Sequence, residues 1–305
     1  GNENNQMVCT KLNGTSKVIC SNGLEVKNPC GEACQTILAQ EGGAEAIEAK
    51  GTPDFSKTAT TDEGMYAAED DYGTTYYYRG AVNDNWFEFG TNSSGQPLYW
   101  RIVRINGDGS IRLIYNGTST TTEGDSTMIN TVQAFNTSYN NNAYVGYMYE
   151  NNQVHGLTTN SSIKTTLDNW YIDNLKDEYA EYLDGNAGFC GDRTSTTTDG
   201  GAPNDTGGTG TTATYYGASY RLHTNKTPTF KCSDIDNDLY TTPGSSKGNG
   251  ALIVNNSNDE NYRDETPTPI GLITADEVAF AGGVVGSSKS NSSYYLYNNA
   301  RYWTM

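Results

Sequence analysis

The stretch YWRIVRINGDGSIRLIYNG, residues 99–117, contains the two strongest strand patterns in the chain. Residues 99–105 and 110–115 are rich in branched and aromatic side chains, and the turn-forming run Asn-Gly-Asp-Gly separates them, which indicates a β-hairpin. Apolar residues fall on both faces of both strands, so we expect this hairpin to be central and covered on both sides. Its arginines, Arg101, Arg104 and Arg112, then need carboxylate or carbonyl partners in the interior.

Aromatic segments just before this hairpin predict a second one. The pattern becomes β-rich from about Met65, and residues 76–80 (YYYRG) and 86–90 (WFEFG) flank the short polar run 83–85 (NDN). We therefore expect these two segments to pair with each other across that polar loop.

Two helices are predicted further along the chain. The longer one covers residues 162–183, which carry an apolar stripe close to helical spacing: Ile163, Leu167, Trp170, Tyr171 and Leu175. The shorter one follows Thr274, which forms a capping-box pattern with Glu277. Gly282 and Gly283 should end this second helix early.

The first 62 residues differ in kind from the rest. A small cysteine-bounded hairpin is followed by helical patterns at residues 29–40 and 44–50 and by a Thr-rich connector. We therefore expect a Cys-containing stalk or connector over residues 1–62 and a main domain over residues 63–305. Within the main domain, the polar segments 191–217 and 255–269 predict long exposed loops.

The charge of the chain excludes two classes of partner. Thirty-six acidic residues against 19 basic ones give a net charge of −17, which opposes binding to nucleic acid or to an anionic membrane surface. No apolar run approaches the roughly 20 residues of a membrane helix, so no membrane segment is predicted in this stretch.

Tyrosine is the most unusual feature of the composition. The chain has 23 tyrosines and only seven phenylalanines, set among Gly, Asn, Ser and Thr. Tyrosine gives recognition surfaces a large, rigid contact area with a polar tip. The alternative is a β-rich fold whose half-buried strands favour Tyr and Thr.

The even number of cysteines indicates disulfides and an oxidising compartment. There are six of them: Cys9, Cys20, Cys30, Cys34, Cys190 and Cys232. Six cysteines allow 15 pairings, among which sequence proximity favours Cys9 with Cys20, and a hairpin turn centred on Gly14-Thr15 would place these two opposite each other. Cys30 with Cys34 and Cys190 with Cys232 would close a small and a long loop. Zinc is the rival for the first four cysteines, although no Cys-x-x-Cys pair or nearby His supports it.

One acidic segment resembles the start of a calcium loop. Asp234, Asp236 and Asp238 alternate after Cys232, as carboxylate ligands of Ca²⁺ do. The segment then departs from the EF-hand pattern, because Leu239 replaces the turn glycine and Ser245 stands where the bidentate glutamate belongs. We expect at most weak calcium binding here, and a solvated acidic loop is the alternative. No other cofactor is predicted.

The sequence offers little material for catalysis, and we predict that the protein is not an enzyme. Cys190 with His155 or His223 as a base is the one nucleophile arrangement to consider, but a cysteine in an even set more often forms a disulfide. No phosphate-binding loop, dinucleotide fingerprint or nucleophile elbow is present.

Four segments resemble, in this order, a family of uncharacterised surface proteins of Gram-positive gut bacteria: residues 99–117, 161–175, 269–283 and 294–305. Members of that family look like distant relatives of the C-type-lectin-like fold, which also includes sulfatase-modifying enzymes. The resemblance implies an α+β domain with two main helices and short twisted antiparallel sheets. It also implies a domain that continues beyond Met305, and a pilin-like segment upstream of Gly1.

The resemblance and the composition together predict a secreted or cell-surface binding protein, adhesin-like, that recognises a glycan or a protein. We expect the contacts in a segment where aromatic and amide side chains alternate: Tyr294, Tyr295, Tyr297, Asn298, Asn299, Arg301 and Tyr302. The alternative for this segment is a buried core strand. The alternative function is a structural pilus or surface-layer component that works by self-assembly.

Overall fold

The computed structural model of the chain describes residues 30–136, 138, 141–142, 146–150, 156–253, 269–283, 291–300 and 302–305, and the backbone of residues 9–11, 18–20 and 25–26. These residues form a mixed α+β structure with several antiparallel sheets, as the sequence predicts. None of the helices in the described part has the length and apolar character that crossing a bilayer requires.

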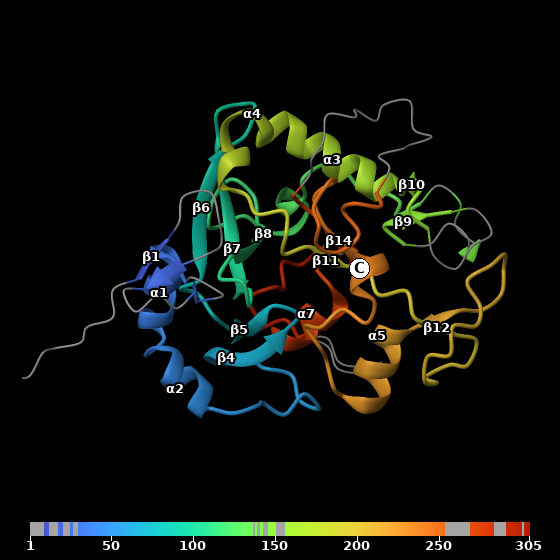
Figure 1. Cartoon of the computed structure of the whole chain (residues 1–305), viewed down its shortest axis with the longest axis horizontal. Coiled ribbons are helices and arrows are strands. Elements are labelled where there is room, and N and C mark those ends of the chain that lie inside the picture. The colour runs from blue at the N-terminus through green and yellow to red at the C-terminus, as the bar shows by residue number, and fades with distance from the viewer. Residues whose placement is uncertain are drawn as a thin grey trace, which may run out of the picture.

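The main sheet is built around one long strand. Its five strands are β4 (Asp62–Asp70), β5 (Gly73–Gly80), β6 (Trp86–Thr91), β7 (Pro97–Ile105) and β8 (Ile111–Tyr115). One edge of β7 pairs with β8, while the other edge pairs first with β6 and then, at its last two residues, with β5. The ribbon formed by β4 and β5 therefore runs across the direction of β6 and β7 (Figure 1).

The predicted central hairpin is confirmed, and so are the partners of its arginines. Arg101 donates to the side-chain oxygen of Asn85 and to the carbonyl of Val82. Arg104 pairs with Asp70 and with Glu277, and Arg112 donates to the carbonyl of Gly188. The hairpin thus encloses three cations, and each has an oxygen partner.

The predicted hairpin between β5 and β6 is wrong. Gly80 at the end of β5 has φ +92°, and a Cβ there would lie 1.9 Å from the carbonyl oxygen of Thr61. The chain then moves along β7, where the Asn85 side chain donates to the Ile102 carbonyl and β6 pairs with residues 97–101. β5 and β6 therefore lie one after the other along the same edge of β7, and the hairpin partner of β5 is β4.

The predicted helices are present, with one break. Residues 162–183 form α3 (Ser162–Asn174), then α4 (Lys176–Tyr179) and a short 3₁₀ turn (Ala180–Tyr182). Tyr171, Ile172 and Leu175 pack on Leu98 and Trp100 of β7. The capping box of Thr274 and Glu277 starts α7 (Ala275–Phe280), in which both reciprocal hydrogen bonds form.

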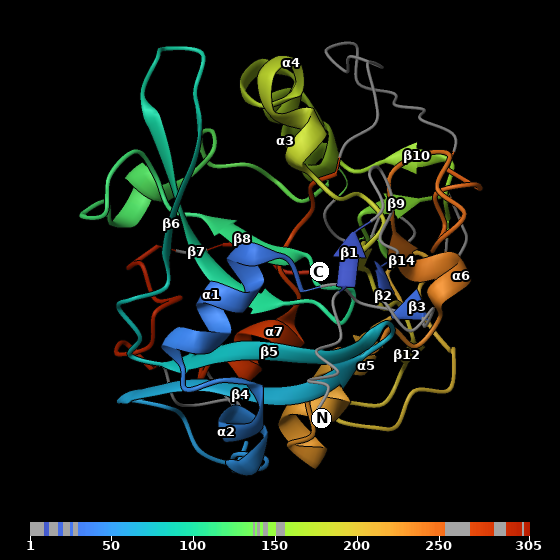
Figure 2. The same ribbon diagram turned by 60° about the vertical axis from the view of Figure 1, so that its left-hand side comes forward.

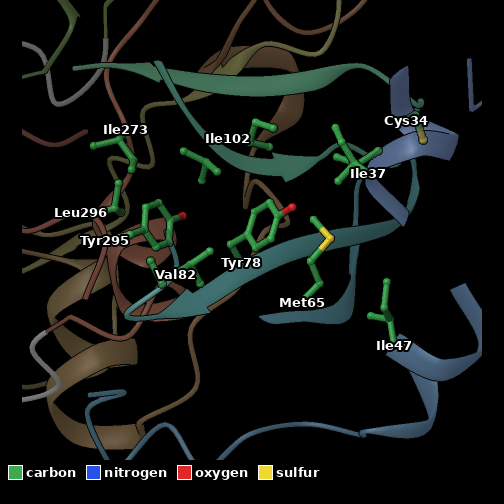
Figure 3. Close-up of a cluster of buried hydrophobic side chains, with 13 residues drawn as sticks. Cys34, Ile37, Ile47, Met65, Tyr78, Val82, Ile102, Ile273, Tyr295 and Leu296 are labelled. Atoms are coloured by element: carbon green, nitrogen blue, oxygen red, sulfur yellow. The ribbon is translucent and has the colours of Figure 1, made fainter. Parts of the chain in front are cut away.

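The N-terminal helices are part of the main core, which corrects the predicted boundary at residue 62 for residues 30–61. Cys34 and Ile37 of α1 (Glu32–Gln40) and Ile47 of α2 (Ala44–Ala49) share one cluster with residues of β4, β5 and β7 (Figure 3). The connector after α2 is also attached, because the Ala59 amide donates to the Gly282 carbonyl. The amphipathic pattern predicts the helices but does not identify the face against which they pack.

The C-terminal part of the chain supplies hydrogen-bond partners for Gly80, the last residue of β5. The Gly80 amide donates to the Ala281 carbonyl, and the Tyr295 amide donates to the Gly80 carbonyl. The buried Asn291 side chain donates to the carbonyls of Ala59 and Gly282, each at 2.7 Å. In both views α7 lies against β5 and α2 against β4 (Figures 1 and 2).

The remaining elements are short. They are β1 (Cys9–Lys11), β2 (Val18–Cys20), β3 (Glu25–Val26), a 3₁₀ turn (Gly124–Thr127), β9 (Met148–Tyr149), β10 (Thr159–Asn160), β11 (Phe189–Cys190), β12 (Ser195–Thr196), β13 (Tyr215–Tyr216), α5 (Gly217–Ser219), a π-helical turn (Tyr220–Asn225), α6 (Ile235–Asp238) and β14 (Leu239–Tyr240). They form two-stranded ladders β9–β10, β11–β14 and β12–β13 and a three-stranded sheet β1–β2–β3.

Two loop predictions have different outcomes. Residues 191–217 are not an exposed loop throughout, because Arg193, Ser195 and Thr196 are buried and β12 pairs with β13. Most of the other predicted loop, residues 255–268, lies outside the described residues.

Disulfides Cys30–Cys34 and Cys190–Cys232 are present, as predicted. The backbone register of β1 and β2 pairs Cys9 with Cys20, as a turn centred on Gly14-Thr15 requires. The side chains of these two residues lie outside the described part. Structural disulfides are typical of proteins outside the cytoplasm.

Candidate functional site

A cavity of about 790 Å³ lies where the main sheet meets the C-terminal part of the chain. Its walls come from the β4–β5 turn, the β7–β8 hairpin, residues 187–193, the π-helical turn and the start of α7, together with residues 302–305. In both views the end of the chain lies in the middle of the molecule, near α7 (Figures 1 and 2). Met305 packs on the cluster that contains Tyr240 of β14. The volume lies in the range of ligand pockets.

One side of the cavity is an ion-pair network centred on Glu277. Its Oε1 accepts the Thr274 amide in the capping box, and its Oε2 faces Arg104 Nε at 3.2 Å and Arg112 Nε at 3.6 Å. Arg104 also reaches Asp70 Oδ2 at 2.9 Å. One glutamate therefore starts the helix and fixes two arginines of the central hairpin.

Asp70 is fixed by the turns on either side of it. Its carboxylate accepts backbone amides from Tyr72, Gly73 and Gly107 at 2.7 to 3.1 Å. A Cβ on Gly107 would collide with the Asp70 side chain and the backbone of Gly73. The turn residue after β7 must therefore be glycine for the two hairpins to meet at this wall.

A second wall is organised by Arg221, which lies in the π-helical turn. Arg221 Nε and Nη2 contact the two oxygens of Asp276 at 2.9 and 2.7 Å, and Nη1 donates to Asp192. Asp276 also accepts the Thr229 amide at 3.0 Å. π-helical turns occur often at functional sites, and this one brings a cation between two carboxylates from distant segments.

Arg193, which also lines the cavity, pairs with Asp238. Asp238 Oδ1 lies 3.0 Å from Arg193 Nη2, and Arg193 Nη1 donates to the Met148 carbonyl at 2.8 Å. Both side chains are buried. The disulfide between Cys190 and Cys232 fastens the segment that carries Arg193 to the segment that carries Asp238.

The ion pairs set the ionisation of the wall carboxylates. Burial by itself would raise the pKa of Glu277, but Arg112 and Arg104 beside it hold that pKa below its ordinary value. Burial would also raise the pKa of Asp192, but the neighbouring Arg221 outweighs it and holds that pKa below its ordinary value. Asp71 differs, because burial raises its pKa and the neighbouring Asp70 adds to the effect. Glu277 and Asp192 are therefore anions at neutral pH.

Aromatic side chains line the rest of the cavity. Trp303 packs edge-on against Phe135, with 5.7 Å between ring centroids, and its Nε1 donates to the Gln133 carbonyl. Tyr302 and Trp303 remain 38% and 50% exposed. Tyr216 and Phe230 belong to the lining as well. Aromatic faces beside fixed polar groups are typical of small-molecule binding sites.

The predicted ligand-binding residues are only partly brought together here. Tyr302 lines the cavity, and its hydroxyl lies 3.2 Å from that of Tyr294. Tyr295 belongs to the core, 6% exposed, and so fits the alternative of a buried segment. The other predicted positions that the structure describes do not line the cavity. Tyr297 and Asn299 are exposed and hydrogen-bonded to each other, and the Asn298 side chain donates to the Thr127 hydroxyl. Arg301 lies outside the described residues.

The three aspartates proposed for calcium do not converge. Asp234 caps α6, where it accepts the amide of Asn237, Asp236 is exposed, and Asp238 is paired with Arg193. In the part of the chain that the structure describes, no group of three His, Cys, Asp or Glu side chains is placed to hold a metal ion. Cys190, the candidate nucleophile, is in a disulfide.

Several cavity residues were missed by the sequence analysis. Asp192 and Arg193 fell inside the predicted exposed loop, and Arg221 carried no motif. A usable signal existed: the acidic chain has only eight arginines, and four of them line this cavity. Buried arginines need oxygen partners, so their scarcity makes each one informative.

Comparisons of the sequence with protein-family models and with curated proteins, and of the fold with solved structures, found no match. The geometry of the cavity therefore carries the functional argument.

Proposed function

We propose that this is a secreted or cell-surface bacterial binding protein that takes its ligand, a glycan or part of a protein, in the cavity described above. The cavity itself is the observation that carries the proposal. It is large enough for a ligand, and its polar groups are held rigidly by ion pairs and backbone amides. Preorganised walls of this kind lower the entropic cost of binding.

The chemistry of the walls favours binding over catalysis. Four of the five lining carboxylates are paired with arginines, and the candidate cysteine is oxidised. Asp71 alone has a raised pKa, and it accepts the Cys232 amide at 2.8 Å. A general acid usually needs a partner base placed on the other side of the reacting bond. The binding proposal therefore assigns no catalytic residue.

A C-type-lectin-like fold is part of the same proposal. Its support is the order of elements along the chain, which follows the resemblance: the central hairpin, then α3, then the capped helix α7, then the aromatic segment from Tyr294. The two disulfides suit a protein displayed outside the cytoplasm.

Binding to glycan and host-protein arrays, followed by affinity measurements on variants, tests the proposal. Tyr302→Ala removes an aromatic side chain from the cavity lining and should weaken binding at least tenfold. Tyr182→Ala is the matched control, because Tyr182 is 68% exposed and does not line the cavity. Tyr297→Ala tests the outer Tyr/Asn surface. Loss of binding in Tyr297→Ala but not in Tyr302→Ala would reject the cavity as the site.

Assembly into a pilus or surface layer is the second candidate, and one observation favours it. Val132, Tyr297 and Trp303 are exposed, and Trp303 is bonded to the loop that carries Val132. Apolar side chains exposed in this way can form contacts between copies. Negative-stain images of the intact protein distinguish the two functions, because filaments would favour assembly and dispersed particles would favour a binder.

A further inference from the structure

The charges that line the cavity balance, although the whole chain is strongly acidic. Five lining side chains are cationic and five are anionic: Arg104, Arg112, Arg193, Arg221 and Lys231, against Asp70, Asp71, Asp192, Asp276 and Glu277. The chain as a whole carries a net charge of −17. A cavity without net charge in such a chain points to a ligand without net charge.

The four lining arginines are also already paired with carboxylates of the protein. Arg104 and Arg112 face Glu277, and Arg221 lies between Asp192 and Asp276. An acidic ligand would have to take a guanidinium away from its buried carboxylate, and a cationic ligand would have to do the reverse. Either exchange leaves a buried charge without its partner, which is costly.

Two polar atoms on the same hairpin have no hydrogen-bond partner among the described residues. One is a donor, Arg112 Nε, whose side chain is 9% exposed and whose nearest carboxylate oxygen is the one of Glu277 at 3.6 Å. The other is an acceptor, Oδ1 of Asn106, a residue that is 4% exposed. Both residues line the cavity. Buried groups of this kind need a partner, and a ligand or water can supply it.

The amide orientation of Asn106 is fixed by its neighbours. Asn106 Nδ2 donates to Ser110 Oγ at 2.9 Å, and Ser110 Oγ in turn donates to Asp108. The free atom of Asn106 is therefore the carbonyl oxygen, an acceptor. Asn106 follows Ile105, which pairs with Ile111, the residue before Arg112. Arg112 lies opposite Arg104, so the unpartnered donor and the unpartnered acceptor are diagonal neighbours, with the Ile105–Ile111 pair between them.

A hydroxyl group matches this pair, because it donates one hydrogen bond and accepts another. Sugar rings combine several hydroxyls with apolar C–H faces, and the aromatic lining offers surfaces for such faces: Phe135, Tyr216, Tyr302 and Trp303. We propose that the cavity binds a neutral sugar residue, with hydroxyl groups at Arg112 Nε and Asn106 Oδ1. This inference rests on the proposed binding function and narrows its ligand class.

The first experiment is a glycan array that presents neutral, sialylated, sulfated and amino sugars to the intact protein. We expect neutral sugars to bind and charged sugars of the same ring type to bind at least tenfold more weakly. A preference for sulfated, carboxylated or amino sugars would overturn the inference while leaving the binding function in place. Absence of any glycan binding would overturn the inference, and the protein array would then decide the binding function.

The second experiment localises the hydroxyl. Asn106→Leu removes the free acceptor and should weaken binding about tenfold, the usual loss for one hydrogen bond. Asn249→Leu is the matched control, since Asn249 is also buried with an unpartnered Oδ1 but does not line the cavity. Equal affinities of Asn106→Leu and Asn249→Leu would contradict the placement.

A series of deoxy sugars with the unchanged protein keeps the test independent of folding. One deoxy position should cost about tenfold in affinity, and Asn106→Leu should show no further loss with that analogue. Equal binding of all deoxy analogues would overturn the hydroxyl site even if the variant did not fold.

Discussion

The two disulfides of the described chain differ most in the length of the loop that each closes, and this predicts unequal effects on stability. Cys190–Cys232 spans 42 positions, whereas Cys30–Cys34 spans four. In the chain-entropy relation, a cross-link stabilises by constraining the unfolded chain, and the effect grows with the logarithm of the loop length. The relation gives about 4 kcal/mol for the long loop and about 2 kcal/mol for the short one.

The test compares two double variants, Cys190→Ala/Cys232→Ala and Cys30→Ala/Cys34→Ala, by urea unfolding at neutral pH. We expect the first to lose about 2 kcal/mol more free energy of unfolding than the second. The comparison is matched, because Cys34 and Cys232 are both buried, 3% and 7% exposed. Thiol titration of the denatured variants checks that the remaining bridges are intact. An equal or larger loss in Cys30→Ala/Cys34→Ala would refute the reasoning from loop length.

Three further predictions concern Glu277, Thr274 and the aspartates after Cys232. The folded-state pKa of Glu277 lies below its ordinary value of about 4.5, so the stabilisation from its ionised form is complete above that pH and is lost as the pH falls through the folded-state value. Urea unfolding at stepwise lower pH should show this decline in the free energy of unfolding. Glu277→Gln should be less stable than the unchanged protein at pH 7, and its stability should depend less on pH. Thr274→Ala should cost about 1 kcal/mol of stability by removing the cap of α7, while Thr274→Ser should cost less, and equal midpoints for the two variants would contradict this. The thermal melting midpoint should be the same in millimolar calcium and in chelator, because Asp238 is paired with Arg193 and Asp234 caps a helix. A clear rise of the midpoint with calcium would support the predicted metal site instead.

The elements that could be predicted from sequence are those whose signals are local. The capping box of Thr274 and Glu277 needs only four residues, and the hairpin at residues 99–115 carries its own turn. The partners of Arg104 and Arg112 could be predicted by type, because a buried guanidinium requires an oxygen. Their identity could not, since Glu277 lies 173 positions from Arg104.

The errors arose where distant segments decide the structure. Residues 76–90 have the sequence pattern of a hairpin, but the Asn85 side chain donates to the Ile102 carbonyl of β7. The local alternation of residues does not predict this distant partner. The polar segment from residue 191 looks exposed, yet Arg193 is buried by its pairing with Asp238, 45 positions away. The candidate cavity could not be predicted for the same reason, because its walls meet only after the whole chain has folded.

The bonds of Asn291 have a consequence for the order in which the chain can fold. Its side chain connects the carbonyl of Ala59, 232 positions earlier, with that of Gly282, while Tyr295 completes the end of β5 at Gly80. Contacts of such sequence separation form slowly, because a long loop must close before they stabilise anything. A chain emerging from the ribosome would therefore keep β5 incomplete until Asn291 and Tyr295 had been synthesised.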